Sequence, residues 1–186
     1  MQTQDPAYED TMIVRVFSGD IVAQSADAIV NTANRALRLG GGIDNAIRTA
    51  AGPEIESALA EHAQLSEGTA IVTPGFKLAA KWVIHTVAPR WEGGAQRELK
   101  MDVFRSCHRS CLEAAQACGA TSIVFPAIGT GAFGWPVELA ADAAMEAVND
   151  WLEDGHATPE LVSFVCPNAA FVETYDRFRQ EWIGQT

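Results

Sequence analysis

The residues best suited to chemistry in this sequence form one short stretch, in which three consecutive glycines at positions 40–42 are soon followed by Asp44. Glycine lets a ligand approach the backbone closely, and the free N–H groups at the start of a helix attract anions. A carboxylate beside an anion site is electrostatically unfavourable unless it has a function there. Asp44 is therefore a candidate general base, although an aspartate in a first helical turn can also simply complement the helix dipole.

Two familiar phosphate-binding motifs do not match this stretch. A P-loop would place a Lys and then a Ser or Thr after the glycines, whereas Ile43 follows here. The dinucleotide-binding fingerprint spaces its glycines as G-x-G-x-x-G, whereas these glycines are contiguous. The stretch therefore predicts a loop in which backbone amides, without a lysine, hold an anion at the start of a helix.

A second glycine-rich stretch lies at residues 126–136, again between a strand pattern and a helical pattern. In open α/β sheets, ligands bind in the crevice at the carboxyl ends of the strands. The two loops can therefore face one cleft and hold a pyrophosphate between them. Phe133, next to Gly134 in this loop, can either contact the ligand or pack in the core, and both interpretations stay open.

Hydrophobic periodicity assigns the elements that carry these loops. Strands are predicted at residues 12–17, 27–31, 69–73, 81–87, 121–125 and 161–165. Helices are predicted at residues 43–51, 53–63, 97–118 and 136–153, and from residue 169 onward. Strands that alternate with helices predict an α/β fold, a three-layer α/β/α sandwich with a mixed, mostly parallel six-stranded sheet. Residues 1–11 are expected to be a flexible lead-in, and residues 12–186 a single domain.

The helix predicted at residues 97–118 is expected to turn one stripe toward the core, comprising Leu99, Val103, Cys107, Cys111, Ala114 and Cys118. Cys166, the remaining cysteine, lies in a strand pattern, so all four are interpreted as small core residues. The cysteines form no C-x-x-C motif that would indicate zinc. Free cysteines of this kind indicate a reducing, cytoplasmic setting.

The chain of 186 residues is 48% hydrophobic and carries a formal net charge of −11. This charge disfavours non-specific binding to nucleic acid, whose phosphates require Lys and Arg, but it allows a small anionic ligand held by backbone amides. No apolar run is long enough to span a membrane, and the polar start does not resemble a signal peptide. We expect a monomer without membrane contact.

Several short motifs, taken in order, resemble the macrodomain family and within it the MacroD-type branch. They are Gly19-Asp20-Ile21, Asn31-Thr32-Ala33-Asn34, Gly40-Gly41-Gly42-Ile43-Asp44, Ala51-Gly52-Pro53, His85-Thr86-Val87-Ala88-Pro89 with Trp91, and residues 129–136. The resemblance extends from about residue 12 to residue 182. It implies the macrodomain fold with ADP-ribose as ligand. MacroD-type members remove ADP-ribose from acidic side chains of proteins and deacetylate O-acetyl-ADP-ribose, and this chemistry requires no metal or redox cofactor.

The resemblance also implies roles for the matched residues. Asp20 would accept a hydrogen bond from the adenine amino group, and the Ile21 N–H would donate to the adenine ring. Asn34, the second candidate catalytic residue, would hold the distal ribose beside Asp44, which stands in the position of the catalytic aspartate. The diphosphate would lie on Gly41, Gly42, Ile43, Gly129, Thr130, Gly131, Ala132 and Phe133, with Phe133 against the distal ribose. By a looser match, Asn168 and Phe171 would edge the adenine.

Two residues beside Asp44 depart from the usual pattern of the branch. Asn45 stands where glycine is usual and adds a side chain beside the expected water site, and Arg48 stands where histidine is usual. Arg48 can pair with Asp44 one helical turn away, and a pair of this kind on the helix surface is worth roughly 0.2–0.5 kcal/mol. Three functions therefore stay open: the hydrolase, a non-catalytic ADP-ribose reader with the same pocket, and, less favoured, a phosphoesterase acting on ADP-ribose phosphates.

Overall fold

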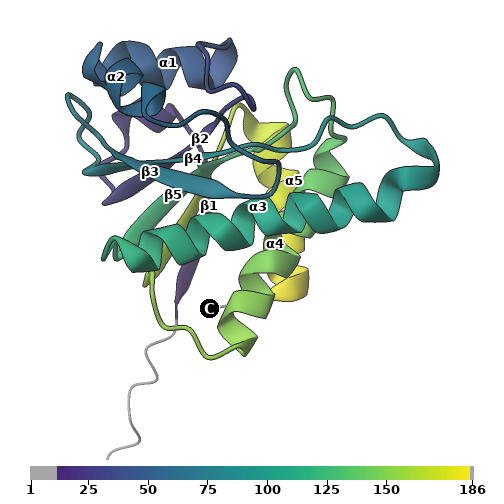
Figure 1. Ribbon diagram of the computed structural model, residues 1–186. Coiled ribbons are helices and arrows are strands. Elements are labelled where there is room, and N and C mark those ends of the chain that lie inside the picture. The colour runs from purple at the N-terminus through teal and green to yellow at the C-terminus, as the bar shows by residue number, and fades with distance from the viewer. Residues whose placement is uncertain (1–11, 185–186) are drawn as a thin grey trace, which may run out of the picture.

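The computed structural model describes residues 12–184, which form a six-stranded sheet between two layers of helices (Figure 1). The strands are β1 (Ile13–Ser18), β2 (Ala28–Thr32), β3 (Ala70–Pro74), β4 (Trp82–Thr86), β5 (Ser122–Pro126) and β6 (Leu161–Cys166). Their order across the sheet is β1-β6-β5-β2-β4-β3. Neighbouring strands are parallel except β3, which runs antiparallel to β4. The predicted mixed, mostly parallel sheet is confirmed.

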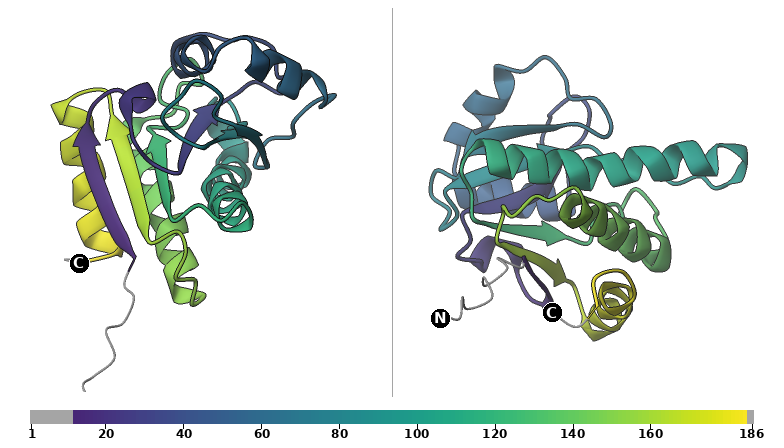
Figure 2. Two further views of the ribbon diagram at one scale, coloured as in Figure 1. Left: turned by 90° about the vertical axis from the view of Figure 1, so that its left-hand side faces the viewer. Right: turned by 90° about the horizontal axis from the view of Figure 1, so that it is seen from below.

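The helices lie on both faces of the sheet, as a three-layer sandwich requires (Figures 1 and 2). They are α1 (Gly42–Ala51), α2 (Glu54–Ala60), α3 (Arg97–Ala117), α4 (Val137–Glu153) and α5 (Ala169–Trp182), with short 3-10 helices η1 (Ile21–Ala23) and η2 (Gly94–Gln96). Helices α1 and α2 cover one face, and α3, α4 and α5 cover the other. Within residues 12–184, each helix is too short or too polar to cross a membrane. The lead-in predicted at residues 1–11 lies outside the described residues.

Each central strand sends alternate side chains into two separate cores, because successive residues of a strand point to opposite faces. In β2, Val30 packs under α3, α4 and α5, whereas Ile29 packs under α1 and α2. In β5, Phe125 and Val124 divide in the same way. Both faces of these strands are therefore apolar, which explains the nearly continuous apolar runs in the sequence.

The buried face of α3 differs from the predicted stripe. Cys107 and Cys111 are buried as expected, but Leu99 is 62% exposed, and Val103, Ala114 and Cys118 are only partly buried. The helix instead buries Met101, Phe104, Cys107, His108, Cys111, Leu112 and Ala115. It packs on β3 and β4 and also on α4, so two adjacent sides are covered, and its N-terminal end projects beyond the sheet (Figure 1). Apolar residues spaced three and four positions apart form several possible stripes on a helix, and this spacing does not indicate which stripe packs against both the sheet and α4.

The carboxyl ends of β1, β6, β5 and β2 lie along one edge of the sheet, because these four strands are adjacent and parallel. The chain leaves β2 through the first glycine loop into α1, and leaves β5 through the second glycine loop into α4. It leaves β1 toward η1, and β6 toward α5. The topology therefore brings four loops together at one edge, where ligands bind in sheets of this type.

Candidate functional site

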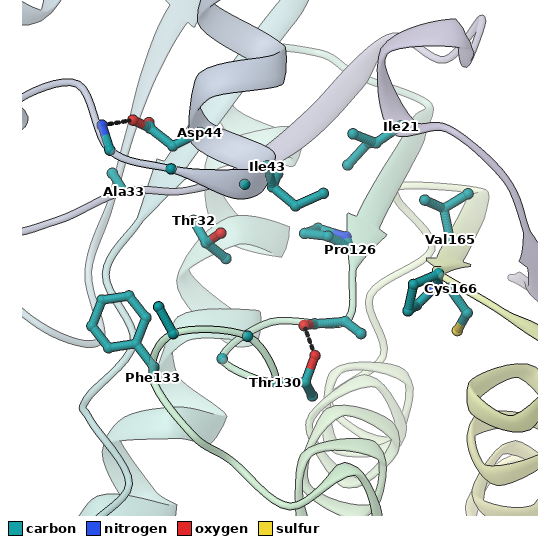
Figure 3. Close-up of a pocket in the computed structure, with 18 of the residues that line it drawn as sticks. Ile21, Thr32, Ala33, Ile43, Asp44, Pro126, Thr130, Phe133, Val165 and Cys166 are labelled. Carbon is teal, nitrogen blue, oxygen red and sulfur yellow. Dashed lines mark hydrogen bonds between the residues drawn. The ribbon is translucent and has the colours of Figure 1, made fainter.

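A cleft of about 660 Å³ opens where these four loops meet (Figure 3). Pockets of this volume accommodate small molecules and cofactors. Thirteen of the residues predicted from the sequence line it: Asp20, Ile21, Asn34, Gly41, Gly42, Ile43, Asp44, Gly129, Thr130, Gly131, Ala132, Phe133 and Phe171. Among residues 12–184, the cleft lining includes no Lys or Arg. An anion bound there would therefore be held by backbone amides, helix ends and polar groups.

Asn168 is the predicted site residue that does not line the cleft. It lies at the N-cap of α5, where its Oδ1 accepts a hydrogen bond from the Phe171 N–H at 3.2 Å. Asparagine is a preferred N-cap residue, because its side chain satisfies an N–H group that the helix leaves free. Asn168 thus holds the start of α5, and Phe171 is the residue of this turn that reaches the cleft.

The first glycine loop delivers the N-terminus of α1 to the cleft. Gly41 is the N-cap of this helix, and no side chain caps its free N–H groups. Gly42 has φ +56°, a conformation that favours glycine. A Cβ on Gly41 or Gly42 would meet no atom within 4 Å, so the backbone borders open space. This arrangement, with helix N–H groups facing an open cleft, suits an anion.

The second glycine loop is held from behind by aromatic side chains. Gly129 has φ +76°, and a Cβ there would lie 2.7 Å from Trp135 Cδ1. Trp135 is fixed in turn, because its Nε1 donates to the carbonyl oxygen of Pro89 at 2.7 Å. A Cβ on Gly131, by contrast, would meet no atom within 4 Å. The loop is therefore tightly packed on its inner side and open on the side of the cleft.

Phe133 packs in the core, as one interpretation of the sequence required, and it also borders the cleft, where a ligand could reach it. Its ring lines the cleft and also packs against the core beneath α3, α4 and α5. The Arg90 guanidinium carbon lies 5.4 Å from the centre of the ring, and Arg90 Nη1 donates to the carbonyl oxygen of Ala132 at 2.9 Å. Figure 3 places Phe133 at the same end of the cleft as Asp44.

The opposite end of the cleft is mostly apolar (Figure 3). Ile21, Val165 and Cys166 are buried there, and burial raises the pKa of the Cys166 thiol to about 11, so the thiol stays neutral. Asp20 lies at the rim, where its Oδ1 accepts a hydrogen bond from the Val22 N–H at 3.1 Å and caps η1. Its carboxylate is exposed, so this end combines apolar side chains with one acceptor.

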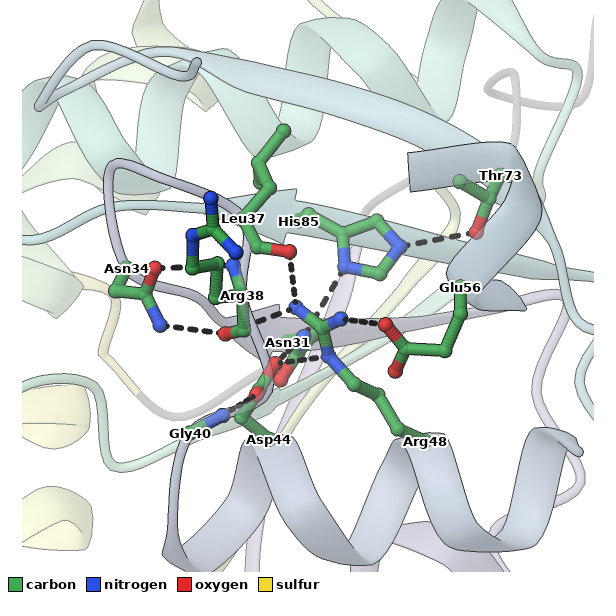
Figure 4. Close-up of polar contacts among 10 residues, drawn as sticks. All are labelled: Asn31, Asn34, Leu37, Arg38, Gly40, Asp44, Arg48, Glu56, Thr73 and His85. Carbon is green, nitrogen blue, oxygen red and sulfur yellow. Dashed lines mark hydrogen bonds and ion pairs between the residues drawn. The ribbon is translucent and has the colours of Figure 1, made fainter. Parts of the chain in front are cut away.

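Asp44 is buried at the edge of the cleft, with both carboxylate oxygens engaged (Figure 4). Its Oδ1 accepts from Asn31 Nδ2 at 2.7 Å and from Arg48 Nε at 2.9 Å. Its Oδ2 accepts from the Gly40 N–H at 2.6 Å. Because an ionised carboxylate has about two acceptor positions on each oxygen, Oδ1 is filled and Oδ2 keeps one position free. Asp44 can therefore still accept one further proton or hydrogen bond, through Oδ2.

The ion pair between Asp44 and Arg48 is buried, which corrects the expectation of a surface pair. The side chains are 3% and 2% exposed, respectively. Arg48 also donates through Nη1 to Glu56 Oε2 at 2.9 Å and through Nη2 to the carbonyl oxygen of Leu37 at 3.1 Å. Its guanidinium thus joins α1, α2 and the first glycine loop. Asn45 is exposed and does not line the cleft. The expectation that its side chain lies beside the water site at Asp44 is therefore wrong.

Asn34, the second predicted catalytic residue, uses its amide to close the loop that precedes the glycines. Its Nδ2 donates to the carbonyl oxygen of Arg38 at 2.6 Å, and its Oδ1 accepts from the Arg38 N–H at 3.2 Å. Asn34 lines the cleft from this position. A ribose hydroxyl at Asn34 would have to share or replace one of these two hydrogen bonds.

Behind Asp44, the structure places residues to which sequence reasoning assigned no role. His85 approaches Asn31 Nδ2 through Nδ1 at 3.0 Å and Thr73 Oγ1 through Nε2 at 2.9 Å. Burial and then the positive charge of Arg48 lower the pKa of His85 to about 3, so the imidazole is neutral near pH 7. His85 lies near the end of β4, a mostly apolar and buried strand, and a polar residue in such a strand was the available signal. Val165 and Cys166, at the end of β6, also line the cleft, and no motif in the sequence marked them.

Comparison with known proteins places these features in one family. A model of the macro domain matches residues 30–144. The chain is 43% identical over 171 residues to an O-acetyl-ADP-ribose deacetylase of Salmonella gallinarum, a match that covers 90% of this chain and 94% of that protein. A structure of the Oceanobacillus iheyensis macrodomain with ADP superposes with a TM-score of 0.86 at 32% identity, covering 96% and 95% of the two chains. A Trypanosoma brucei macrodomain in complex with ADP-ribose gives a TM-score of 0.80 at 32% identity, covering 88% and 68%.

Proposed function

Because this chain belongs to the macrodomain family, we propose that it is an ADP-ribose-binding hydrolase that deacetylates O-acetyl-ADP-ribose. Likeness to the Salmonella deacetylase over 90% of the chain supports this activity. The observation that carries the proposal is the position of Asp44, a buried carboxylate at the edge of the cleft with one acceptor position left on Oδ2. A reader needs the cleft but has no need of a carboxylate there.

The shape of the cleft supports one orientation of the ligand. The apolar end, with Ile21, Val165 and Cys166, suits the adenine, and Asp20, next to Ile21 in the chain, can accept from the adenine amino group. The two glycine loops face the middle of the cleft, where backbone amides can hold the diphosphate. The distal ribose then lies at the end that holds Asp44 and Phe133. In this orientation the labile bond of O-acetyl-ADP-ribose lies beside the carboxylate.

Deacetylation then follows from general-base catalysis. Oδ2 of Asp44 takes a proton from a water molecule while the water oxygen attacks the ester carbonyl carbon. The tetrahedral intermediate collapses with cleavage of the bond to the ribose oxygen, which receives the proton from Asp44. The products are ADP-ribose and acetic acid, which loses its proton to solvent. The two glycine loops contribute by holding the diphosphate and so fixing the ester next to Asp44.

The same chemistry supports a second substrate class. A glutamate or aspartate that carries mono-ADP-ribose is also joined to the distal ribose through an ester, so we include removal of this modification in the proposal. The alternative is a non-catalytic ADP-ribose reader. The observation that favours the reader is the set of three donors on Asp44, which together with burial restrict the access of water to the carboxylate.

The hydrolase and the non-catalytic reader are distinguished by measuring turnover and ADP-ribose binding on both the wild type and Asp44→Ala. We expect the wild type to release acetate from O-acetyl-ADP-ribose and ADP-ribose from a glutamate-modified protein. Asp44→Ala should lose on the order of 10²–10⁴-fold in kcat, as expected for removal of a general base, and should still bind ADP-ribose in calorimetry. Wild-type protein that binds ADP-ribose but turns over neither substrate would establish the reader. Asp44→Ala with wild-type turnover would place the base elsewhere.

A further inference from the structure

A buried chain of hydrogen bonds leads from Asp44 away from the cleft, through Asn31 and His85 to Thr73 (Figure 4). We propose that Asn31, His85 and Thr73 are positioning residues that fix the orientation of the Asp44 carboxylate for hydrolysis. This inference rests on the proposed function, because it assigns these three residues to the same reaction. None of them lines the cleft, so they would act through Asp44 and not on the substrate.

The chain of hydrogen bonds crosses three adjacent strands. Asn31 in β2 and His85 in β4 are direct partners in the parallel pair, and Thr73 lies in β3, the antiparallel neighbour of β4. Asn31 and His85 are fully buried, and Thr73 is 2% exposed. The side chains therefore sit in a rigid part of the sheet, away from solvent. A carboxylate held from this direction is anchored to the sheet as well as to α1.

The order of donors and acceptors in the chain is determined from end to end. Asn31 Nδ2 carries two hydrogens, one directed to Asp44 Oδ1 at 2.7 Å and one to His85 Nδ1 at 3.0 Å. His85 Nδ1 must therefore be an acceptor without a hydrogen, and the neutral imidazole carries its proton on Nε2. That Nε2–H donates to Thr73 Oγ1 at 2.9 Å. The Thr73 hydroxyl thus holds the imidazole in place by accepting from Nε2–H, and His85 Nδ1 accepts from one N–H of Asn31 and so keeps the other N–H directed to Asp44.

The carbonyl oxygen of Asn31 gives an independent indication of this role. Asn31 Oδ1 is buried and has no hydrogen-bond partner among the described residues. A buried acceptor without a partner does not favour folding and requires an explanation. The reversed amide would place Oδ1 against the Asp44 carboxylate and remove the N–H from His85 Nδ1. The observed orientation therefore satisfies Asp44 and His85 at the expense of the Asn31 carbonyl.

The consequence for catalysis concerns the direction in which Oδ2 of Asp44 can accept a proton. Asn31 and Arg48 fill Oδ1, and the Gly40 N–H fills one position on Oδ2, so the remaining acceptor position points in one direction. Loss of the Asn31 hydrogen bond frees the carboxylate to rotate on that side. Rotation misplaces the proton acceptor without changing the groups that hold ADP-ribose. We therefore expect an effect on kcat and not on KM.

The experiment compares Thr73→Val, which removes the hydroxyl from a side chain of almost equal shape, with Thr73→Ser, which keeps it. Thr73→Val should lower kcat on O-acetyl-ADP-ribose by roughly tenfold, with the KM and the ADP-ribose affinity within about twofold of wild type. Thr73→Ser should restore kcat to about the wild-type value. A loss shared equally by both variants, or a loss that appears in ADP-ribose affinity, would overturn the positioning role.

A second pair acts at the next link of the chain. His85→Asn keeps an acceptor facing Asn31, whereas His85→Leu removes it, so His85→Leu should lose more kcat than His85→Asn at equal ADP-ribose affinity. Equal kcat in wild type, Thr73→Val and His85→Leu would overturn the inference and leave the proposed function intact. A wild type that binds ADP-ribose but hydrolyses nothing would instead overturn the proposed function itself. The two failures are therefore distinguishable.

Discussion

Arg48 contributes to this site mainly by binding three parts of the fold at once. Its guanidinium is buried and donates to Asp44, to Glu56 and to the carbonyl oxygen of Leu37. Removing one partner of a buried ion pair leaves the other charge uncompensated in a medium of low dielectric constant. Arg48 is therefore a structural part of the first glycine loop as well as a partner of the proposed base.

We predict that Arg48→Ala lowers the free energy of unfolding by about 3 kcal/mol or more, as expected for a broken buried pair. The matched change is Glu56→Gln, because the Glu56 side chain is 49% exposed and Gln can still accept from Arg48. Glu56→Gln should cost less than about 1 kcal/mol. Urea denaturation of both variants gives the comparison. Equal losses in the two variants would contradict the interpretation that burial, and not the charge pair alone, makes Arg48 important.

At the scale of elements, the second glycine loop meets opposite requirements on its two sides. Gly129 is pressed against Trp135, while Gly131, two residues on, borders the open cleft. The inner side supplies rigidity, because Trp135 is itself bonded to Pro89. The outer side leaves the backbone free to approach a ligand.

These two glycines form a matched pair of test positions. Gly129→Ala places a Cβ 2.7 Å from Trp135 Cδ1 at φ +76°, so it should lower the free energy of unfolding by roughly 2 kcal/mol or more. Gly131→Ala adds the same group in open space and should change stability by less than about 0.5 kcal/mol. Thermal or urea unfolding measures both. A large loss at Gly131, or none at Gly129, would contradict tight packing on the inner side of the loop.

For the molecule as a whole, the buried histidines make stability depend on pH. Burial lowers the pKa of His85 to about 3 and of His108 to about 4. A histidine with a lowered folded-state pKa is protonated first in the unfolded chain, so its contribution is present above its ordinary pKa near 6.5. That contribution is lost as the pH falls toward the folded-state value.

We therefore predict that the free energy of unfolding falls by about 2 kcal/mol per buried histidine between pH 7 and pH 5. His108 packs among Phe104, Phe125 and Phe164 and has an unpartnered Nε2 among the described residues. His108→Phe should remove one of the two contributions and reduce the loss by about 2 kcal/mol. An unchanged difference in His108→Phe would contradict the assignment.

Much of this molecule can be predicted from its sequence because the relevant patterns are local. Glycine and proline mark the ends of strands, and the predicted bounds of most elements lie within a few residues of those observed, as for β5 (Ser122–Pro126) against residues 121–125. The parallel sheet then brings the loops after β2 and β5 to one edge, whatever the details of packing. The cleft-lining positions in the glycine loops follow from these two facts.

Only the tertiary structure decided which contacts those local elements make. Several apolar stripes on α3 have helical spacing, and the sheet together with α4 selects the one around Phe104 and His108. Helical spacing predicted that Arg48 reaches Asp44, but α2 and the glycine loop bury the pair. Asn31 and His85 are 54 positions apart and meet because β2 and β4 are neighbours in the sheet. Local propensity contains no information about such pairs, since strand order and burial are properties of the complete fold.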